Sequence, residues 1–477
     1  MAQTFYWYDL ETSGTLPKWD RIVQFAGVRT DADLNVIGDE YCTYVQLADD
    51  VLPNPEASLV TGITPQLTYR QGIPEIQALR KIHELFTQPE TCVVGYNSLR
   101  FDDEFIRYSF YRNMLDPYAR EWQQGNSRWD IIDLVRATGG LRRDGIEWPR
   151  DDDDLPVYKL EELTKANGID HGHAHDAMSD VHATIGMARL IKQHQPKLFD
   201  YYFGLKHKKQ VRAALEPIGS KICVHVSGMY PRHRFGVAPI LPIAAHPSNS
   251  NSVIVVDLAE DVEDLLSDSA ESLKEKLFTA GHPERPPLKE IRLNRCPFIA
   301  PLEVLNEENL DRLQINMRDV KERARRLKQP GLAMKIAATY QQPRPKAETD
   351  PDAALYDAFL AETDRSRCRD FHDHLETRGF RHMDFEDTRL QRLSQRLKAR
   401  SFAAMLEPEE AAGWQDFVVT KLESEGGWLN INTYEQRLEQ LLLDEQSVDD
   451  VSVNQSRVKI LQALAEHGMD IRSRYRL

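Results

Sequence analysis

Asp9 and Glu11, two carboxylates one residue apart near the N-terminus, are the residues whose types and spacing first suggest chemistry. They follow an aromatic run that begins at residue 5, a composition typical of a β-strand. Side chains two positions apart in a strand point to the same face, so both carboxylates would share one face. A hard divalent cation bound by oxygen ligands would relieve their repulsion. The alternative is a solvated pair at a strand end, and acids elsewhere in the chain must decide between the two.

Asp102 is the next acid whose position suits such a site. It follows a short apolar segment at residues 92–96 and lies where a helix is predicted to begin. The positive end of the helix dipole helps to keep a carboxylate ionised at this position. Asp102 is therefore a candidate third ligand, although an ordinary acid at a helix N-terminus has the same pattern.

A run of histidines precedes the fourth acid, Asp180. The histidines alternate along the chain as His171, His173 and His175. A helix predicted over residues 176–193 would fix Asp180 and leave His175 on the loop before it. A zinc cluster is disfavoured because no further Cys or His stands at a useful spacing, whereas a solvated loop stays open for His171 and His173. An imidazole titrates near neutral pH and can remove a proton from a bound water, which makes His175 the candidate general base.

Four carboxylates and one histidine converging on a cleft would form a hydrolytic centre. Two divalent cations about 3.5 to 4 Å apart support in-line attack on a phosphodiester. An oxygen-only ligand set favours Mg²⁺ or Mn²⁺ over softer metals. The candidate ligands are Asp9, Glu11, Asp102 and Asp180, with His175 as the base. The pattern predicts a metal-dependent phosphodiester hydrolase.

The elements that must position these residues follow from the apolar patterns of roughly the first 195 residues. Strands are predicted at residues 5–10, 22–30, 41–47 and 92–96. Helices are predicted at residues 74–86, 101–112, 128–138, 159–166 and 176–193. This is an α/β layout that begins with a meander.

The pattern changes after that point. Between residues 202 and 340, short strands at 222–226, 237–243 and 252–258 are broken by Pro and Gly, with helices near 265–278 and 319–328. This favours a small barrel or sandwich. Residues 341–351 have the composition of a linker, and residues 353–477 show helical spacing throughout. We therefore predict three domains, at residues 1–196, 197–344 and 345–477.

Length and composition bound the class of protein. A chain of 477 residues is too long for one core, and 41% hydrophobic with 28% charged residues is typical of soluble globular proteins. No apolar run approaches the roughly 18 residues of a membrane helix, and the polar start lacks a signal sequence, so a cytoplasmic protein is expected. The five scattered cysteines form no C-x-x-C pair, which argues against a disulfide framework and a zinc ribbon.

Charge is unevenly distributed along the chain. A formal net charge of -15 would by itself discourage a nucleic-acid partner. Basic residues nevertheless gather at residues 100–143, 206–212 and 321–328, and each run alone could be a solvated helix face. In the first run, tyrosines and Trp122 are interleaved with the arginines, which suits stacking on unpaired bases beside a neutralised backbone.

Three motifs stand in one order along the chain: Asp9-x-Glu11, Asn97-x-x-x-Phe101-Asp102 and His175-x-x-x-x-Asp180. In them the sequence resembles the DEDD superfamily of 3′ to 5′ exonucleases, specifically its histidine-bearing, DnaQ-like (DEDDh) branch. Similarity to the bacterial exodeoxyribonuclease I family extends along almost the whole chain. It is carried by residues 101–104, 110–113, 126–130, 163–169, 174–178 and 224–229.

The resemblance implies both a fold and an activity. The fold is an α/β, ribonuclease-H-like exonuclease domain with a mixed sheet, followed by an SH3-like β domain and a C-terminal all-helical domain. The activity is processive hydrolysis of single-stranded DNA from the 3′ end, which releases 5′-mononucleotides in DNA repair and recombination. Two Mg²⁺ ions, for which Mn²⁺ can substitute, and a monomeric state are also implied.

Roles for individual residues come with the resemblance. Asp9, Glu11, Asp102 and Asp180 would hold the metal ions, and His175 would be the base. The positions that match family DNA contacts are Glu11, Arg107, Tyr118, Trp122, Arg136, Lys159 and Lys208. Two positions depart from the family pattern. Lys159 replaces an Arg, which keeps the charge but loses bidentate phosphate geometry, and Ser250 replaces another Arg.

The family also binds a partner, the acidic, Phe-terminated tail of single-stranded DNA-binding protein, and Arg142 and Tyr201 match positions of that contact. Two other functions stay open. An exoribonuclease acting on RNA 3′ ends would keep the chemistry, although such relatives are little more than the nuclease domain. A module that only binds DNA would have lost an acid or the histidine, and all five are present.

Overall fold

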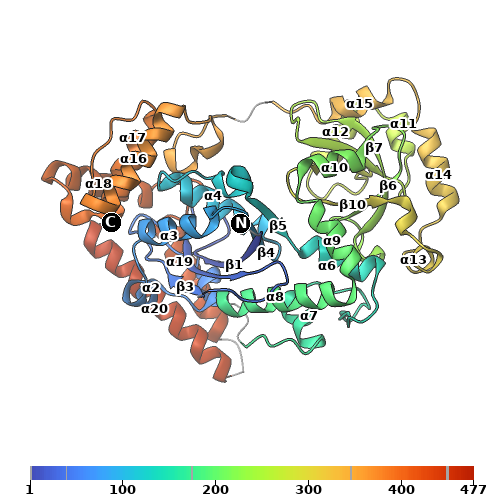
Figure 1. Cartoon of the computed structure of the whole chain (residues 1–477). Coiled ribbons are helices and arrows are strands. Elements are labelled where there is room, and N and C mark those ends of the chain that lie inside the picture. The colour runs from blue at the N-terminus through green and yellow to red at the C-terminus, as the bar shows by residue number, and fades with distance from the viewer. Residues whose placement is uncertain (1–2, 39, 173–175, 344–345, 447–450) are drawn as a thin grey trace.

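Three domains follow one another in the computed structural model, which describes residues 3–38, 40–172, 176–343, 346–446 and 451–477 (Figure 1). The N-terminal domain lies in the middle of the view, the second domain on the right, and the C-terminal helices on the left and below. The element order confirms the predicted sequence of an α/β, a β-rich and an all-helical unit.

The N-terminal domain is built on a mixed five-stranded sheet of order β3-β2-β1-β4-β5. β1 (Thr4–Thr12), β2 (Ile22–Thr30) and β3 (Tyr41–Tyr44) form the antiparallel meander predicted from the sequence. β4 (Thr91–Gly95) pairs in parallel with β1, and β5 (Ser127–Asp130) in parallel with β4. The carboxyl ends of β1 and β4 therefore meet at the same edge of the sheet.

Helices cover both faces of this sheet. In chain order they are α1 (Pro55–Thr61), α2 (Pro65–Gln71), α3 (Glu75–Thr87), α4 (Asp102–Arg112), α5 (Ala119–Trp122), α6 (Ile132–Leu141), α7 (Leu160–Ala166) and α8 (Ala177–His194). Trp7 of β1 points into the core beneath α8, whereas Tyr8 points to the opposite face, beneath α3 and α4. Because strand side chains alternate, Asp9 and Glu11 continue the face of Trp7, on the side of α8.

One predicted helix, at residues 128–138, is wrong in its first part. The chain forms β5 there, and α6 begins only at Ile132. Pairing with β4 and burial of Trp129 outweigh the local helical pattern, because both are long-range contacts that the pattern does not contain. Asp130 ends the strand, since its Oδ1 accepts the N–H groups of Ile132 at 2.9 Å and Asn97 at 2.8 Å.

The second domain holds a five-stranded antiparallel sheet of order β10-β6-β7-β8-β9. Its strands are β6 (Cys223–Val226), β7 (Val237–Ala245), β8 (Ser252–Asp257), β9 (Leu288–Arg292) and β10 (Phe298–Pro301). The helices around it are α10 (Lys208–Leu215), α11 (Glu263–Ser267), α12 (Ala270–Phe278), α13 (Glu307–Arg312), α14 (Met317–Arg326) and α15 (Leu332–Thr339). The three predicted strands correspond to β6, β7 and β8.

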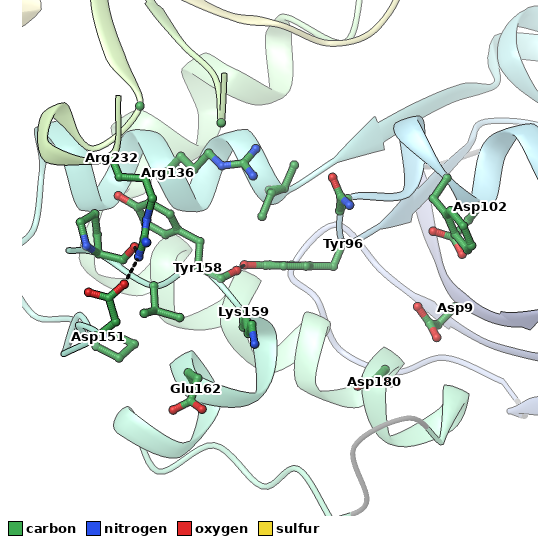
Figure 2. A pocket seen from close by; sticks show the side chains of 18 of the residues that line it. Asp9, Tyr96, Asp102, Arg136, Asp151, Tyr158, Lys159, Glu162, Asp180 and Arg232 are labelled. Carbon is green, nitrogen blue, oxygen red and sulfur yellow. Dashed lines mark hydrogen bonds and ion pairs between the residues drawn. The ribbon is translucent and has the colours of Figure 1, made fainter. Parts of the chain in front are cut away.

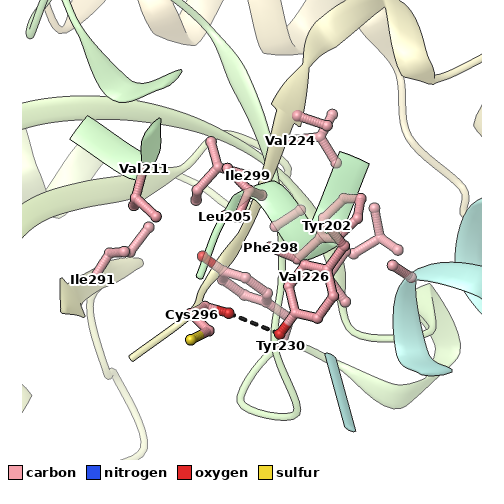
Figure 3. Close-up of a cluster of buried hydrophobic side chains, with 14 of the residues drawn as sticks. Tyr202, Leu205, Val211, Val224, Val226, Tyr230, Ile291, Cys296, Phe298 and Ile299 are labelled. Atoms are coloured by element: carbon pink, nitrogen blue, oxygen red, sulfur yellow. Dashed lines mark hydrogen bonds between the residues drawn. The ribbon is translucent and has the colours of Figure 1, made fainter. Parts of the chain in front are cut away.

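A continuous hydrophobic core joins the first two domains (Figure 3). Tyr202 lies on α9 (Pro196–Gly204), between the domains. Its ring centroid lies 5.4 Å from that of Trp129 in the first domain and 5.6 Å from that of Phe298 in the second. Its hydroxyl lies 2.8 Å from the carbonyl oxygen of Cys296. α9 thus fixes the second domain on the first.

The C-terminal domain is helical, as predicted. It comprises the 3-10 helix η5 (Pro351–Tyr356), α16 (Glu362–Arg378), α17 (Thr388–Ser401), α18 (Pro408–Glu423), α19 (Ile431–Gln446) and α20 (Val451–Tyr475). α20 contacts α1 and α2, α17 contacts α3, and η5 contacts α4, so this domain packs on the N-terminal one. Across the described parts of the chain, no helix has both the length and the apolar composition to cross a membrane.

A buried ion network ties the C-terminal domain to the N-terminal one. Asp50 and Asp352 are fully buried. Arg400 Nη2 lies 2.6 Å from a carboxylate oxygen of each, and Lys421 Nζ lies 2.8 Å from Oδ2 of Asp50. Burial would raise the pKa of both carboxyls, but the surrounding cations together outweigh it, Arg400 with Lys421 at Asp50 and Arg400 with Arg396 at Asp352, so each pKa lies below its ordinary value.

Candidate active site

The predicted acids meet at the carboxyl edge of the first sheet. Asp9 and Glu11 lie near the end of β1, and Asp180 lies in the first turn of α8, which packs across that strand. Ligand oxygen atoms of these three residues all lie within 4.8 Å of one another. The parallel pairing of β1 with β4 brings Asp102, the first residue of α4, to the same edge, on the side of Asp9 (Figure 2).

Burial and mutual repulsion raise the pKa values of these carboxyls. For Asp9, burial followed by the charges of Asp102 and Asp180 places the pKa well above its ordinary value. The same causes raise the pKa of Glu11 to about 8, and burial raises that of Asp102. Burial and mutual repulsion thus oppose the ionisation of these carboxyl groups. A hard divalent cation bound by their oxygen atoms would remove the repulsion, so the cluster fits such a cation.

Two of the three histidines of the run, His173 and the predicted base His175, lie outside the described residues. The solvated position left open for His171 is excluded, because its side chain is 7% exposed and its Nε2 lies 2.6 Å from Oδ1 of Asp180. Nδ1 of the same ring lies 3.0 Å from Oγ1 of Thr164 on α7. His171 therefore links α7 to an acid of the site, a contact for which the histidine run was the sole sequence signal.

The carboxylate next to Asp102 anchors the start of α4. Asp103 is buried, and its Oδ1 accepts hydrogen bonds from Arg120 Nη2 at 2.7 Å and from the Tyr8 hydroxyl at 2.9 Å. Its Oδ2 pairs with Arg128. Burial raises the pKa of Asp103, but the two arginines outweigh it, so the pKa lies below its ordinary value. One carboxylate of this pair is thus held ionised, and the helix it anchors presents the other to the site.

A cavity of about 1050 Å³ has the acids at one end (Figure 2). Three of the predicted substrate contacts line it, namely Glu11, Arg136 and Lys159. Tyr96, which the sequence reasoning missed, lies between the acids and the opposite end. The second domain completes the wall with residues that include Arg232. The cavity therefore belongs to two domains, although all its predicted residues come from the first.

Arg107, Tyr118 and Trp122, the other predicted contacts of the first domain, lie outside this cavity, on α4 and around α5. Arg107 is nearly buried, and its Nε and Nη2 donate to the two carboxylate oxygens of Glu121 at 2.8 and 3.1 Å. Its guanidinium carbon lies 5.5 Å from the centroid of the Tyr118 ring. Trp122 is 66% exposed and presents a large aromatic face to solvent.

The C-terminal domain extends this aromatic surface. Phe359 is 82% exposed, and its ring centroid lies 6.5 Å from that of Tyr118. The hydroxyl of Tyr356 donates to Glu104 of α4 at 2.5 Å. Sequence reasoning missed both residues, because a helical pattern read along the chain does not show which segment returns to α4 and α5.

Lys208, the predicted contact of the second domain, begins α10 and hydrogen bonds to Asn251. Ser250, where the family's Arg is replaced, lies beside it, and its carbonyl oxygen accepts a hydrogen bond from Arg212 Nη2 at 3.1 Å. Arg212 belongs to the basic run at residues 206–212 but was not among the predicted contacts, and it brings a guanidinium beside Ser250.

Arg142 and Tyr201, the predicted partner contacts, both bond to main-chain carbonyl groups of the second domain. Arg142 Nη2 donates to the oxygen of Val304 at 3.1 Å, and the Tyr201 hydroxyl donates to that of Ile299 at 2.7 Å. Tyr201 is 40% exposed. Both therefore lie along the contact between the first two domains.

Comparison with known proteins gives concordant matches along the chain. Three family models match: Exonuclease over residues 6–188, Exonuclease I SH3-like domain over residues 206–342, and Exonuclease I C-terminal domain over residues 349–471. Exodeoxyribonuclease I of Escherichia coli (strain K12) is 44% identical over 419 residues, 86% of this chain and 88% of that protein. Exodeoxyribonuclease I of Haemophilus influenzae is 39% identical over 477 residues, 98% of each chain.

Solved structures agree with the sequence matches. E. coli Exonuclease I in complex with a dA16 oligonucleotide is 39% identical, with a TM-score of 0.92 over 98% of this chain and 100% of that one. An SSB/Exonuclease I structure with the inhibitor CFAM has a TM-score of 0.88 and 39% identity over 99% of this chain and 100% of that one. Oligoribonuclease of Neisseria meningitidis, 29% identical over 136 residues, covers 24% of this chain and 72% of that protein.

Proposed function

This chain belongs to the exonuclease I family, and we propose that it hydrolyses single-stranded DNA from the 3′ end and releases 5′-mononucleotides. The observation that carries the proposal is the cluster of acids at one end of a cavity lined by two domains. In a relative of the same fold, the bound ligand is a dA16 oligonucleotide. End-labelled single- and double-stranded DNA, incubated with the protein and Mg²⁺, tests it. Equal or faster attack on the duplex would contradict it.

Four carboxylates are proposed to hold two Mg²⁺ ions, and Mn²⁺ suits the same oxygen donors. They are Asp9, Glu11, Asp102 and Asp180. When bound, the ions would acidify a water and stabilise the leaving 3′ oxygen. Glu11, at the cavity wall, would also contact the terminal nucleotide, and His175, by its place in the third motif, would accept the proton of the water.

Glu11 gives the metal proposal a pH-dependent test. Its pKa is about 8 in the folded protein without metal, above the usual value near 4.5. Between about pH 4.5 and 8 the unfolded chain ionises this carboxyl while the folded protein keeps its proton, so the contribution of Glu11 to the stability of the metal-free protein should fall as pH rises through this window. Saturating Mg²⁺ should weaken the dependence, because the cation replaces the proton. Thermal unfolding from pH 5 to 8, with EDTA and with Mg²⁺, measures both effects.

The variant Glu11→Gln is the control for that experiment, because it removes one of the titrating groups and should reduce the loss of stability with rising pH, while Asp9 and Asp102 keep their own raised pKa values. An equal pH dependence in the parent protein and in Glu11→Gln would contradict the proposal. Buried histidines such as His372 and His467, whose pKa values burial lowers to about 4, add stability as pH rises, but they act equally in both proteins. The buried carboxyls Asp50 and Asp352 cannot mask the effect. Their pKa values lie below the ordinary range, so the stability they contribute is complete above about pH 4 and is lost only at lower pH.

A track for the strand outside the cavity is proposed on the exposed aromatic surface around α5. Trp122→Ala should weaken binding of an oligonucleotide long enough to reach it by about 1 to 3 kcal/mol, the contribution of one stacked base. Fluorescence anisotropy in EDTA measures this without turnover. A dinucleotide too short to reach α5 should bind the variant and the parent protein equally, and an equal loss for both ligands would count against a track.

RNA is the alternative substrate. The oligoribonuclease match covers 24% of this chain, so it supports the shared chemistry and says nothing of the second and third domains. Competition between DNA and RNA oligonucleotides of one sequence decides between them. Preferential loss of the RNA would overturn the assignment to DNA.

A protein partner is proposed from the same relatives. The SSB/Exonuclease I structure supports binding of the acidic, Phe-terminated tail of single-stranded DNA-binding protein, with Arg142 and Tyr201 as the contacts in this chain. Titration with a fluorescent tail peptide tests the proposal, with a peptide lacking the terminal Phe as the control. Light scattering, measured as the protein elutes from a size-exclusion column, gives its molar mass and so tests the proposed monomeric state.

A further inference from the structure

The cavity that holds the acids carries more cationic than acidic side chains in the rest of its lining, where the acids are Asp151 and Glu162. Four cationic side chains line the cavity: Arg136 on α6, Arg150 and Lys159 on the segment before α7, and Arg232. Arg232 comes from the second domain, at the start of the 3-10 helix Arg232–Arg234. Figure 2 shows Arg232 and Arg136 at the end of the cavity away from Asp9 and Asp180. A polyanion whose reacting end lies among metal-bound acids would meet these cations with its next phosphates.

Arg232 is occupied by an acid of the first domain. Its Nη2 lies 2.6 Å from Oδ2 of Asp151 and 3.1 Å from the carbonyl oxygen of Pro156. The other carboxylate oxygen of Asp151, Oδ1, accepts the N–H groups of Leu155 at 2.9 Å and Asp153 at 3.2 Å. The two oxygens of Asp151 thus have separate tasks: Oδ1 closes a turn, and Oδ2 binds Arg232.

The Arg232–Asp151 pair is not what holds the two domains together. The side chain of Arg232 is 51% exposed and that of Asp151 31%, and exposed ion pairs contribute little to stability. The continuous core around Tyr202 already fixes the second domain on the first. The pair can therefore open at small cost and leave Arg232 free for another anion.

The loop that carries Arg232 is shaped around Arg136. A Cβ atom at Gly228 would lie 2.8 Å from Nη2 of Arg136, and one at Gly236 would lie 2.8 Å from the main-chain oxygen of Ser227. Gly236 also has a φ of 72°, which side chains rarely adopt. Glycine at position 228 lets the loop approach Arg136 of the first domain, and glycine at position 236 lets the loop close on its own backbone at Ser227. Two guanidinium groups from different domains thus line one end of the cavity.

We propose that Arg232 and Arg136 form a phosphate subsite, and that Asp151 occupies Arg232 until a nucleotide phosphate displaces it. Carboxylate and phosphate both accept paired hydrogen bonds from a guanidinium, so one can replace the other. The phosphate belongs either to the strand upstream of the scissile bond or to the released 5′-mononucleotide. This inference rests on the proposed function and adds to it a substrate contact that the second domain supplies within the cavity.

Two variants should have effects of opposite sign. Arg232→Ala removes the phosphate contact. Asp151→Asn removes the competing charge but keeps an amide oxygen that can still accept the N–H groups of Leu155 and Asp153. If the pair served only to hold the loop, both substitutions would weaken binding. If Asp151 competes with phosphate, Asp151→Asn strengthens it.

The experiment measures KM, kcat and inhibition by dTMP on a single-stranded oligonucleotide with Mg²⁺. For a contact to the strand, Arg232→Ala should raise KM about tenfold with kcat unchanged, and Asp151→Asn should lower KM about twofold to fivefold. For a contact to the product, KM should stay constant in both variants. The inhibition constant of dTMP should then rise about tenfold in Arg232→Ala and fall about twofold to fivefold in Asp151→Asn. Arg326→Ala, which breaks an exposed ion pair with Glu263 in the same domain, is the matched control and should change neither.

Binding without turnover separates this inference from the proposed function. Anisotropy of a labelled oligonucleotide and calorimetry with dTMP, both in EDTA, report the subsite even if the parent protein hydrolyses no DNA. For a contact to the strand, Arg232→Ala should also reduce the salt dependence of oligonucleotide binding by about 0.7 in log–log slope, the loss of one phosphate contact. The proposal would be overturned if Arg232→Ala left both KM and the inhibition constant of dTMP unchanged. It would also be overturned if Asp151→Asn raised both constants.

Discussion

Replacement of Asp180 by asparagine is expected to lower the rate of single-strand hydrolysis by at least about 10³-fold, because one oxygen ligand of the proposed metal centre loses its charge. Asparagine keeps the size of the side chain and an oxygen for the hydrogen bond from His171. The same variant should raise the melting temperature of the metal-free protein, since a charge that raises the pKa of Asp9 and Glu11 is removed. Loss of activity and gain of stability together identify a metal site rather than a structural acid.

Three measurements check that result: hydrolysis rate, thermal unfolding in EDTA, and Mn²⁺ binding by electron paramagnetic resonance. The matched control is Asp200→Asn, an exposed acid on α9 outside the cavity, for which no change is expected. Activity of Asp180→Asn within tenfold of the parent protein would remove the basis of the metal-centre proposal. So would unaltered Mn²⁺ affinity.

Replacement of Asp352 by alanine should have the largest effect on stability. It should lower the free energy of unfolding by about 3 to 5 kcal/mol. The carboxylate is fully buried between Arg400 at 2.6 Å, Arg396 at 3.0 Å and Arg21 at 3.5 Å. Without it these guanidinium groups stay in a low-dielectric contact between domains with one anion fewer, and uncompensated buried charge is costly. Urea unfolding, followed by tryptophan fluorescence, measures the loss.

Asp373, an exposed acid on α16, provides the control for Asp352. Asp373→Ala should change the free energy of unfolding by less than about 0.5 kcal/mol, as is usual for surface substitutions. A second comparison is internal to the network. Asp352→Asn retains the shape and part of the hydrogen bonding, so it should cost less than Asp352→Ala. An effect of Asp352→Ala no larger than that of the surface control would contradict the assigned role.

Much of the fold and the proposed metal ligands could be predicted because they rest on local patterns. The period of two in β1 placed Asp9 and Glu11 on one face, and the starts of two helices placed Asp102 and Asp180. The order of the motifs indicated that they meet. The placements within β1 and at the helix starts need only residues a few positions apart, whereas the convergence of the motifs came from their order and the family resemblance.

Contacts between segments far apart in the chain could not be predicted from the sequence. β5 was taken for helix because its partner, β4, lies more than 30 residues earlier. The bonds of His171 to Asp180 and Thr164, the position of Phe359 beside Tyr118, and the pair between Arg232 and Asp151 each depend on tertiary geometry. The spacing of apolar residues along the sequence predicts which face of an element is buried. The local sequence around a polar residue does not indicate which group its side chain will bond.

The core around Tyr202 limits how this protein can be divided into working parts. An excised nuclease unit ending after α8 would lose α9 and bare the surface of Trp129 that Tyr202 covers, and it would lack the wall that contains Arg232. The C-terminal helices meet the N-terminal domain through the buried ion network and through apolar clusters as well, one of which joins Tyr108 and Tyr111 to Leu355 and Phe371. A cut at either junction would therefore expose apolar surface, and the nuclease unit is expected to need both of its neighbours for stability.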